Sequence, residues 1–457
     1  MKSDVVHTQR EAHSPPTVVP LGAALAYWLK LGFISFGGPA GQIGLMHQEV
    51  VERQRWVSEK RFLHALNYTM VLPGPEAQQL ATYLGWLMHG TWGGLAAGTL
   101  FVLPSLALLI ALSWVYLAFG DLPVVTGVLY GIKPAVTAIV LFAAYRIGSR
   151  ALKRWPLWLV AAAAFVAIFA LDVPFPAIVV GAALIGIAGA QIAPGVFQLG
   201  TNGHAATGTP VLKALIDDDT PTPEHARYST SRTVMLLVFG VGLWGGALGL
   251  LAGLGGWTGT GTQMGVFFSK AAMVTFGGAY AVLPYVFQGG VETYAWLSAP
   301  QMIDGLALGE TTPGPLIMVV AFVGYLGGWN HAMLGADALA WSGTAGAVIA
   351  TFFTFLPSFL FILVGGPLVE ATRHDLKLAA PLSAITAAVV GVIVNLALFF
   401  AYHVLWPQGL NALFEWPAAL IGAAAFIALF RYRRGVVEVI AIAGATGMAM
   451  QLLTGSV

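Results

Sequence analysis

Cysteine is absent from the 457-residue chain. Disulfides, thiolate metal sites, iron–sulfur clusters and a cysteine nucleophile are therefore excluded. The 10 histidines are scattered without the spacing of metal ligands, so we expect no metal and no other cofactor. Walker, G-x-S-x-G and Rossmann motifs are also missing, so the sequence does not predict an enzyme or an ATP-driven pump.

Charge is equally scarce. Only 9% of the residues are charged, 58% are hydrophobic, and the mean hydropathy is +0.79. Soluble domains carry about 25% charged residues, so we expect this chain to lie in a lipid bilayer. A net charge of +1 provides no basic field, and a nucleic-acid partner is not expected.

Apolar stretches close to the length that crosses ~30 Å of hydrocarbon recur along the chain. They predict an all-α polytopic membrane protein with about 10–13 membrane segments. Two segments, 61–90 and 300–329, are apolar but interrupted. We expect full spans at 18–40, 92–118, 124–146, 155–171, 174–195, 262–287, 338–365, 380–402, 416–430 and 435–453.

The second half of the chain repeats the first at a shift of 240 residues, because Lys30 falls on Lys270 and Pro73-Gly74-Pro75 falls on Pro313-Gly314-Pro315. Three motifs in one register are rarely kept by chance, so the sequence predicts two homologous repeats. Further pairs in the same register are Phe36-Gly37-Gly38 with Phe276-Gly277-Gly278, Gln48 with Gln288, Trp56 with Trp296, and Ser58 with Ser298.

The repeats divide the chain into four predicted parts. A polar tail covers residues 1–17 and lacks the apolar core of a signal peptide. The first membrane repeat covers 18–195, and the second covers 262–457. Between them, 196–261 holds a polar linker and an extra apolar segment.

Corresponding loops of the two repeats swap their charge. The loop 45–61 carries four Lys or Arg residues and its partner 288–300 carries none, whereas 172–175 has none and 431–434 has three arginines. By the positive-inside rule the two repeats are inserted in opposite orientations, the plan of many secondary transporters. The same swap holds for 146–154 against 403–415 and for 119–123 against 366–378.

The extra segment 233–256 complicates this inversion. If the interrupted segments are re-entrant, each repeat has five full spans, and this odd number inverts the second repeat without a further crossing. A crossing at 233–256 would undo the inversion. The sequence therefore leaves open whether 233–256 spans the membrane.

Each interrupted segment contains a Pro-Gly-Pro triplet, which cannot continue a helix. Backbone groups freed in lipid must face protein or a water-filled cavity. New helices should begin near Pro75 and Pro315 with free N–H groups, and such helix starts attract anions. We therefore predict an anion site at Pro73, Gly74, Pro75 and their copies Pro313, Gly314 and Pro315. The alternative is a plain turn without a ligand.

Glycine pairs and lysines repeat in the same way. Gly37-Gly38 and Gly277-Gly278 permit unwinding beside a ligand, although close helix packing explains them equally well. Lys30 and Lys270 lie inside apolar runs, where a lysine is costly unless it faces a cavity or partner. We assign all six residues to the anion site, and snorkelling to the interface is the alternative for the lysines.

One acid lies beside each triplet: Glu76 follows the first and Glu310 precedes the second. A buried carboxylate there could carry protons in a coupled cycle. The alternative for Glu76 is a first-turn acid that complements the helix dipole. His64 and Asp304, which share a register, are attributed to a membrane boundary.

Basic residues elsewhere receive simpler interpretations. Those of the loop 45–61, Arg61 among them, are interpreted mainly as topology determinants, and gathering of anions is the alternative. Lys133 is expected at an interface. Ser58 and Ser298 are expected to cap the helices that follow them.

The motifs together resemble the chromate ion transporter family in its long, two-domain bacterial form. The resemblance rests on "FGGPAGQIGLMHQEVVERQRWVSEKRFL", "LPGPEAQQLATYLG" and "FVLPS" in the first half. In the second half it rests on "KAAMVTFGGAYAVLPYV", "WLSAPQMIDGLALGETTPGPL" and "FLPSF". It covers about residues 20–400.

The resemblance implies a transporter of the bacterial cytoplasmic membrane that expels chromate and confers chromate resistance. The residues themselves indicate only a tetrahedral oxyanion, so sulfate or molybdate stays an alternative substrate. An anion channel or receptor stays an alternative of another class. The expected partners are the oxyanion and the lipid bilayer, and the sequence leaves a homodimer open.

Overall fold

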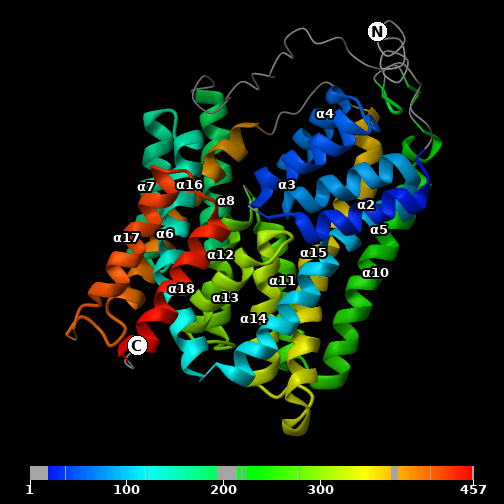
Figure 1. The fold of residues 1–457 in the computed structure, drawn as a ribbon. Coiled ribbons are helices and arrows are strands. Elements are labelled where there is room, and N and C mark those ends of the chain that lie inside the picture. The colour runs from blue at the N-terminus through cyan, green and yellow to red at the C-terminus, as the bar shows by residue number, and fades with distance from the viewer. Residues whose placement is uncertain are drawn as a thin grey trace, which may run out of the picture.

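The computed structural model describes residues 19–454 except 37, 121, 193–213, 218, 219, 222, 277, 372–378 and 412. The predicted tail 1–17, Gly37 and Gly277 therefore lie outside the described residues. The described residues form helices with a single isolated bridge, between Val57 and Ile216 (Figure 1). The all-α prediction is therefore confirmed.

Seven helices in the described part of the chain are long and apolar enough to cross a membrane. Two shorter apolar helices, α7 (Trp155–Leu171) and α17 (Trp416–Phe430), lie among them. The seven are α5 (Glu76–Phe119), α6 (Pro123–Ala151), α8 (Phe175–Ile192), α10 (Thr230–Gly255), α15 (Leu339–Ala371), α16 (Ala379–Leu405) and α18 (Val436–Thr454).

Besides the single turns η2 (Glu224–Ala226) and η5 (Ala336–Ala338), the remaining helices in the described part of the chain are short and come in pairs separated by a break that contains glycine. The first repeat contains α2 (Leu21–Ile34) with α3 (Gly38–His47) and η1 (Gln48–Arg53), then α4 (Glu59–Val71) with the start of α5. The second repeat contains α11 (Thr260–Val274) with α12 (Ala279–Phe287) and η3 (Gln288–Thr293), then α13 (Ala299–Thr311) with η4 (Leu316–Met318) and α14 (Val319–Asn330).

The first pair of each repeat is a re-entrant hairpin. The ring of Tyr27 on α2 lies 5.5 Å from the ring of Trp56, which follows the second arm. The equivalent residues, Phe267 on α11 and Trp296, lie 5.4 Å apart. Each second arm therefore returns alongside its first arm instead of crossing the membrane.

The Pro-Gly-Pro pairs are hairpins too. Asn330 at the end of α14 donates a hydrogen bond to the carbonyl oxygen of Trp296, just before α13, at 2.9 Å. In the first repeat, non-helical torsions at His89 and Gly90 turn α5 from the hairpin arm into a full span. Ser58 and Ser298 cap α4 and α13 through their side chains, as the sequence predicts.

These hairpins correct the count of crossings. The expected spans at 18–40 and 262–287 are broken at Ser35 and Thr275 and do not cross. Each repeat then has four full spans in the described part, an even number, so the crossing of α10 is what inverts the second repeat. Figure 1 shows the equivalent helices accordingly antiparallel: α5 ends at the lower end of the molecule, where α15 begins.

Inversion gathers the basic loops at one end of the molecule. The loops 45–61, 146–154 and 431–434 lie at the upper end in Figure 1, which we call the basic end. The loops without Lys or Arg, such as 288–300 and 403–415, lie at the opposite end. The charge swap between the repeats thus gives the molecule one end rich in Lys and Arg and an opposite end whose corresponding loops lack them.

The span that follows α5 or α15 in each repeat packs against the last two spans of the other repeat. Helix α6 packs against α17 and α18, and α16 packs against α7 and α8, on the left of Figure 1. Small residues permit this close approach. A Cβ at Gly131 would lie 2.0 Å from the carbonyl oxygen of Ala443, and one at Gly391 would lie 2.0 Å from that of Ala161.

Candidate anion site at the helix breaks

The breaks of the two repeats meet through reciprocal backbone hydrogen bonds. The N–H of Gly74, in the first triplet, donates to the carbonyl oxygen of Thr275 at 2.7 Å. The N–H of Gly314, in the second triplet, donates to the carbonyl oxygen of Ser35 at 2.8 Å. Each bond joins a Pro-Gly-Pro triplet to the break of the other repeat's first hairpin. The fold therefore brings the predicted triplets and the segments beside Gly38 and Gly278 together.

Glycine is required in both triplets by the backbone and by packing. The φ angle is 123° at Gly74 and 107° at Gly314, in the region that favours glycine. A Cβ on Gly74 would lie 2.5 Å from Oγ of Ser358, and one on Gly314 would lie 3.0 Å from Oγ of Ser105. Each glycine thus faces a serine of the other repeat's long span.

The second arms of the hairpins begin at this centre. Pro75 is the N-cap of α5 and Pro315 is the N-cap of η4, and neither helix start has a side-chain cap. The first intrahelical bonds run from Gln79 to Pro75 at 3.0 Å and from Met318 to Pro315 at 2.9 Å. The N–H groups before them are free of helical partners and carry partial positive charge.

Buried amide and hydroxyl groups surround the breaks. Gln42 donates to the carbonyl oxygen of Gly314 at 2.6 Å, and Gln79 donates to that of Pro73 at 2.8 Å and to Oγ of Ser358 at 3.3 Å. Within the described residues, Oγ of Ser105 and the Oε1 atoms of Gln42 and Gln79 are buried without a hydrogen-bond partner. Buried polar groups normally have partners, so these atoms mark the meeting point of the breaks as a polar centre.

The sequence analysis did not name Gln42, Ser105 or Ser358 as site residues. The two serines end the repeated motifs "FVLPS" and "FLPS". That repetition was the available signal for them. Gln42 has no polar counterpart, because Val282 occupies its position in the second repeat.

The two acids have different surroundings. Glu310 is half-buried on α13, accepts a 2.5 Å hydrogen bond from the hydroxyl of Tyr280, and lies within electrostatic range of Arg146. Glu76 is half-buried at the first position of α5, and its carboxylate has no hydrogen bond or ion pair to the described residues. Only Glu310 has a built polar environment.

The lysines lie on exposed faces of α2 and α11. Lys270 lines a largely apolar cavity of about 660 Å³ that α4, α10, α11 and α15 enclose in part. Its lining includes Leu72, Val274 and Pro357, which directly precede Pro73, Thr275 and Ser358. The cavity therefore reaches the edge of the centre. Lys30 is not part of its lining.

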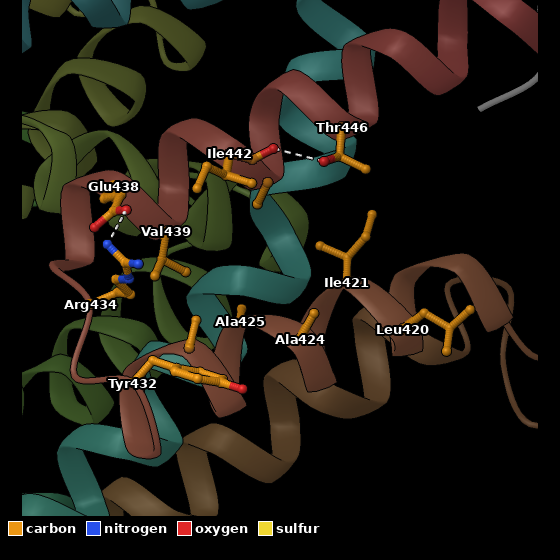
Figure 2. Close-up of a pocket in the computed structure, with 12 residues that line it drawn as sticks. Leu420, Ile421, Ala424, Ala425, Tyr432, Arg434, Glu438, Val439, Ile442 and Thr446 are labelled. Atoms are coloured by element: carbon orange, nitrogen blue, oxygen red, sulfur yellow. Dashed lines mark hydrogen bonds and ion pairs between the residues drawn. The ribbon is translucent and has the colours of Figure 1, made fainter.

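A second cavity, of about 590 Å³, lies far from the breaks, between α17 and α18 (Figure 2). Two pairs of its polar groups are engaged: Arg434 pairs with Glu438 at 3.3 Å, and Thr446 donates to the carbonyl oxygen of Ile442 at 2.8 Å. Tyr432 is exposed, and the rest of the lining is mostly alanine and branched aliphatic residues. Its lining contains none of the buried, unpartnered side-chain atoms that mark the centre.

Comparison with known proteins identifies the family. The family described as chromate transporter matches residues 23–187 and 262–448. The chain belongs to the chromate transporter family. The matched ranges contain both pairs of hairpins.

Curated relatives cover almost the whole chain. A chromate transport protein of Pseudomonas aeruginosa is 32% identical over 96% of this chain and 94% of its own. One of Cupriavidus metallidurans is 28% identical over 95% of this chain and 93% of its own. An uncharacterized transporter of Methanocaldococcus jannaschii is 25% identical over 83% of this chain and 84% of its own. No solved structure matches.

Proposed function

We propose that this protein is a secondary transporter that exports chromate across the bacterial cytoplasmic membrane and thereby confers chromate resistance. Membership of the chromate transporter family and relatives named chromate transport protein support the substrate. The meeting of the two triplets with the other repeat's breaks, through Gly74 and Gly314, carries the proposed site.

The chromate dianion binds between the helix starts at Pro75 and Pro315, against the triplets and the turns at Gly38 and Gly278. Free N–H groups and the hydroxyl of Ser105 supply donors around a tetrahedral guest. Hydrogen bonds to a charged group contribute about 1.5–3 kcal/mol each, so a few of them can replace hydration. A cluster of such donors at four inverted breaks supports this arrangement better than a plain turn.

The paired lysines serve the approach of the anion. Lys270 lines the cavity that reaches the centre, and its positive charge raises the local concentration of a dianion. Lys30 takes the equivalent position in the inverted repeat. In an alternating-access cycle each lysine acts when its own side is open.

Proton movement is proposed to couple to the anion through a carboxylate beside a break. Glu310 is favoured over Glu76, because Tyr280 holds it and Arg146 lies near it. A negative carboxylate close to a dianion is unfavourable, and protonation removes that repulsion. Proton binding and anion binding would then support each other.

The basic end supports the direction of insertion. Loops rich in Lys and Arg stay on the cytoplasmic side, which supports a cytoplasmic position for the loops 45–61, 146–154 and 431–434. Export then moves the anion from the basic end toward the opposite end.

A second oxyanion is a specific alternative, because the donors at the centre are backbone N–H and hydroxyl groups that suit any tetrahedral dianion. Sulfate and molybdate present the same charge and shape. A channel or receptor built on the same cavity is the alternative of another class. Counterflow separates these classes, since a channel shows none.

The deciding experiment measures radiolabelled chromate accumulation in inverted membrane vesicles. We expect saturable accumulation with counterflow, competition by sulfate, and inhibition by a proton ionophore. Pro73→Ala should abolish accumulation, whereas Pro123→Ala, at the first turn of α6 away from the breaks, should not. Absence of chromate accumulation with intact sulfate transport would reject chromate as the substrate in favour of sulfate. Uptake without counterflow would reject a transporter in favour of a channel.

A further inference from the structure

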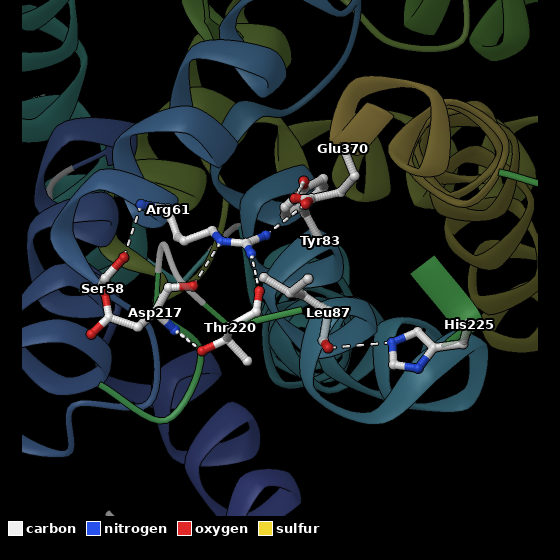
Figure 3. A network of polar contacts seen from close by, with 8 residues as sticks. All are labelled: Ser58, Arg61, Tyr83, Leu87, Asp217, Thr220, His225 and Glu370. Atoms are coloured by element: carbon white, nitrogen blue, oxygen red, sulfur yellow. Dashed lines mark hydrogen bonds and ion pairs between the residues drawn. The ribbon is translucent and has the colours of Figure 1, made fainter. Parts of the chain in front are cut away.

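A buried ion pair joins the start of α4 to the end of α15 (Figure 3). Arg61, at the start of α4, contacts Glu370, at the end of α15, with 2.6 Å between Nη1 and Oε2, and the two side chains are only 3% and 1% exposed. Tyr83 donates to the other carboxylate oxygen at 2.5 Å. Arg61 also donates to the carbonyl oxygens of Asp217 and Thr220, at 3.3 and 3.0 Å. The sequence interpretation of Arg61 as a topology determinant misses this role.

A second buried cluster lies toward the opposite end. Asp304, on α13, contacts Nζ of Lys133 at 3.5 Å and accepts a hydrogen bond from the hydroxyl of Tyr116 at 3.0 Å. The carboxylate of Asp304 is only 4% exposed. Lys133 is 31% exposed, and Oδ1 of Asp304 has no partner in the described part of the chain.

The two clusters correspond to each other in the inverted repeats. Arg61 lies on the first arm of one Pro-Gly-Pro hairpin, and Asp304 lies on the first arm of the other. Glu370 and Tyr116 lie near the ends of the equivalent long spans, α15 and α5. Each cluster therefore ties the hairpin of one repeat to the long span of the other, on opposite sides of the central breaks.

We propose that these two clusters are the opposing gates of the transport cycle, with Arg61–Glu370–Tyr83 closing the basic end and Asp304–Lys133–Tyr116 closing the opposite end. This inference rests on the proposed alternating-access function. A buried ion pair seldom stabilises a fold more than apolar residues of similar volume would. Removal of one partner, however, strongly destabilises the conformation that contains the pair. They therefore suit a contact that must exist in one state and separate in the other.

The two clusters differ in how tightly they are held. The Arg61 cluster is buried, and both oxygens of Glu370 have partners. The Asp304 cluster has a longer ion pair, a part-exposed lysine, and a carboxylate oxygen without a partner in the described part of the chain. The Arg61 cluster is therefore the more tightly held of the two proposed gates.

Accessibility of a single cysteine tests the gates without any substrate. Because the parent chain has no cysteine, Ser358→Cys places one thiol beside Gly74 at the centre. A membrane-impermeant thiol reagent is applied to either face in sealed right-side-out and inverted vesicles. We expect Glu370→Gln to raise the labelling rate from the basic end about tenfold and lower it from the other face, and Asp304→Asn to do the reverse.

Three further variants control for folding and charge. Tyr83→Phe keeps the ion pair and should shift labelling in the same direction as Glu370→Gln by a smaller factor, so the test survives if Glu370→Gln fails to fold. The double variant Arg61→Glu with Glu370→Arg should return the labelling rates toward the parent values. Glu438→Gln breaks an exposed pair between Arg434 and Glu438 and should change neither rate.

Labelling that rises equally from both faces, or that is unchanged in folded Glu370→Gln and Tyr83→Phe variants, would overturn the gate assignment. Because the readout contains no chromate, such a failure differs from failure of the proposed function. If labelling follows the gates but chromate is not transported, the gates stand and the substrate assignment falls.

Discussion

Gly74 and Thr275 are 201 positions apart in the chain, yet the N–H of one donates to the carbonyl oxygen of the other at 2.7 Å. The equivalent pair, Gly314 and Ser35, makes the same bond at 2.8 Å. Backbone groups freed by a break in one repeat are thus satisfied by a break in the other. This reciprocity explains how broken helices persist inside an apolar protein, where unpaired backbone groups are costly.

The triplet glycines should not tolerate a side chain. We expect Gly74→Ala to cost about 1–3 kcal/mol of stability and to abolish transport, because φ is strained for alanine and the new Cβ meets Ser358. Gly409→Ala is the matched control: its φ is also positive, at 92°, but no atom lies within 4 Å of the added Cβ. Transport and thermal unfolding in detergent measure both effects. Equal transport in the two variants would show that the triplet is not part of the transport site.

Ser105 should serve the anion more than the fold. Its buried hydroxyl has no partner in the described residues, so Ser105→Ala removes an unsatisfied group and should leave stability unchanged or slightly raised. We expect KM for chromate to rise about tenfold, the loss of roughly one charged hydrogen bond. Ser113→Ala on the same helix removes a hydroxyl that already donates to Leu109, and KM should not change. A KM unaffected by Ser105→Ala would exclude this hydroxyl as a ligand.

Substitution of Glu310 should flatten the dependence of transport on pH. In the parent, rising pH deprotonates the carboxylate and opposes binding of the dianion, so transport should fall. Glu310→Gln is permanently neutral and should transport at a rate that no longer responds to pH. Tyr280→Phe removes the hydrogen bond to Glu310 and should displace the pH profile without flattening it. An unchanged profile in both Glu310→Gln and Glu76→Gln would remove the carboxylates from the coupling.

Lysine substitutions should reveal the approach path. We expect Lys270→Ala to raise KM about fivefold by the loss of local positive potential, with an effect that shrinks at high salt. Lys270→Arg should retain most of the affinity, and Lys153→Ala, in an exposed loop, should have no effect. Equal KM in Lys270→Ala and Lys153→Ala vesicles would assign Lys270 to the lipid interface instead.

The sidedness of the loops can be measured independently of transport. A cysteine at Leu413, which is 91% exposed, should react with an impermeant reagent from the periplasmic face. A cysteine at exposed Arg433 should react only from the cytoplasmic face, because one crossing, α17, separates the two positions. Labelling of both from the same face would contradict the inverted arrangement.

The sequence by itself determined the repeats, the two Pro-Gly-Pro breaks and the inversion. Pro-Gly-Pro cannot continue a helix, identical spacing reveals duplication, and the swap of basic loops reports opposite insertion. These signals are local or depend on register, so they survive without coordinates. The residues beside the breaks, including Glu310 and the triplets, could be named for the same reason.

Only the tertiary structure decided how the breaks are used. A glycine break has the same sequence pattern in a bent span and in a hairpin, so 18–40 and 262–287 were predicted as crossings. In the structure, Tyr27 lies beside Trp56 and Phe267 lies beside Trp296, and both segments are hairpins. The sequence also did not predict that Ser105 and Ser358 lie at the centre or that Arg61 pairs with Glu370. Arg61 and Glu370 are 309 positions apart, and neither is unusual at a helix end until packing buries them together. Whether a side chain is buried and which residue it contacts depend on tertiary packing. A single sequence does not reveal either property for residues so far apart in the chain.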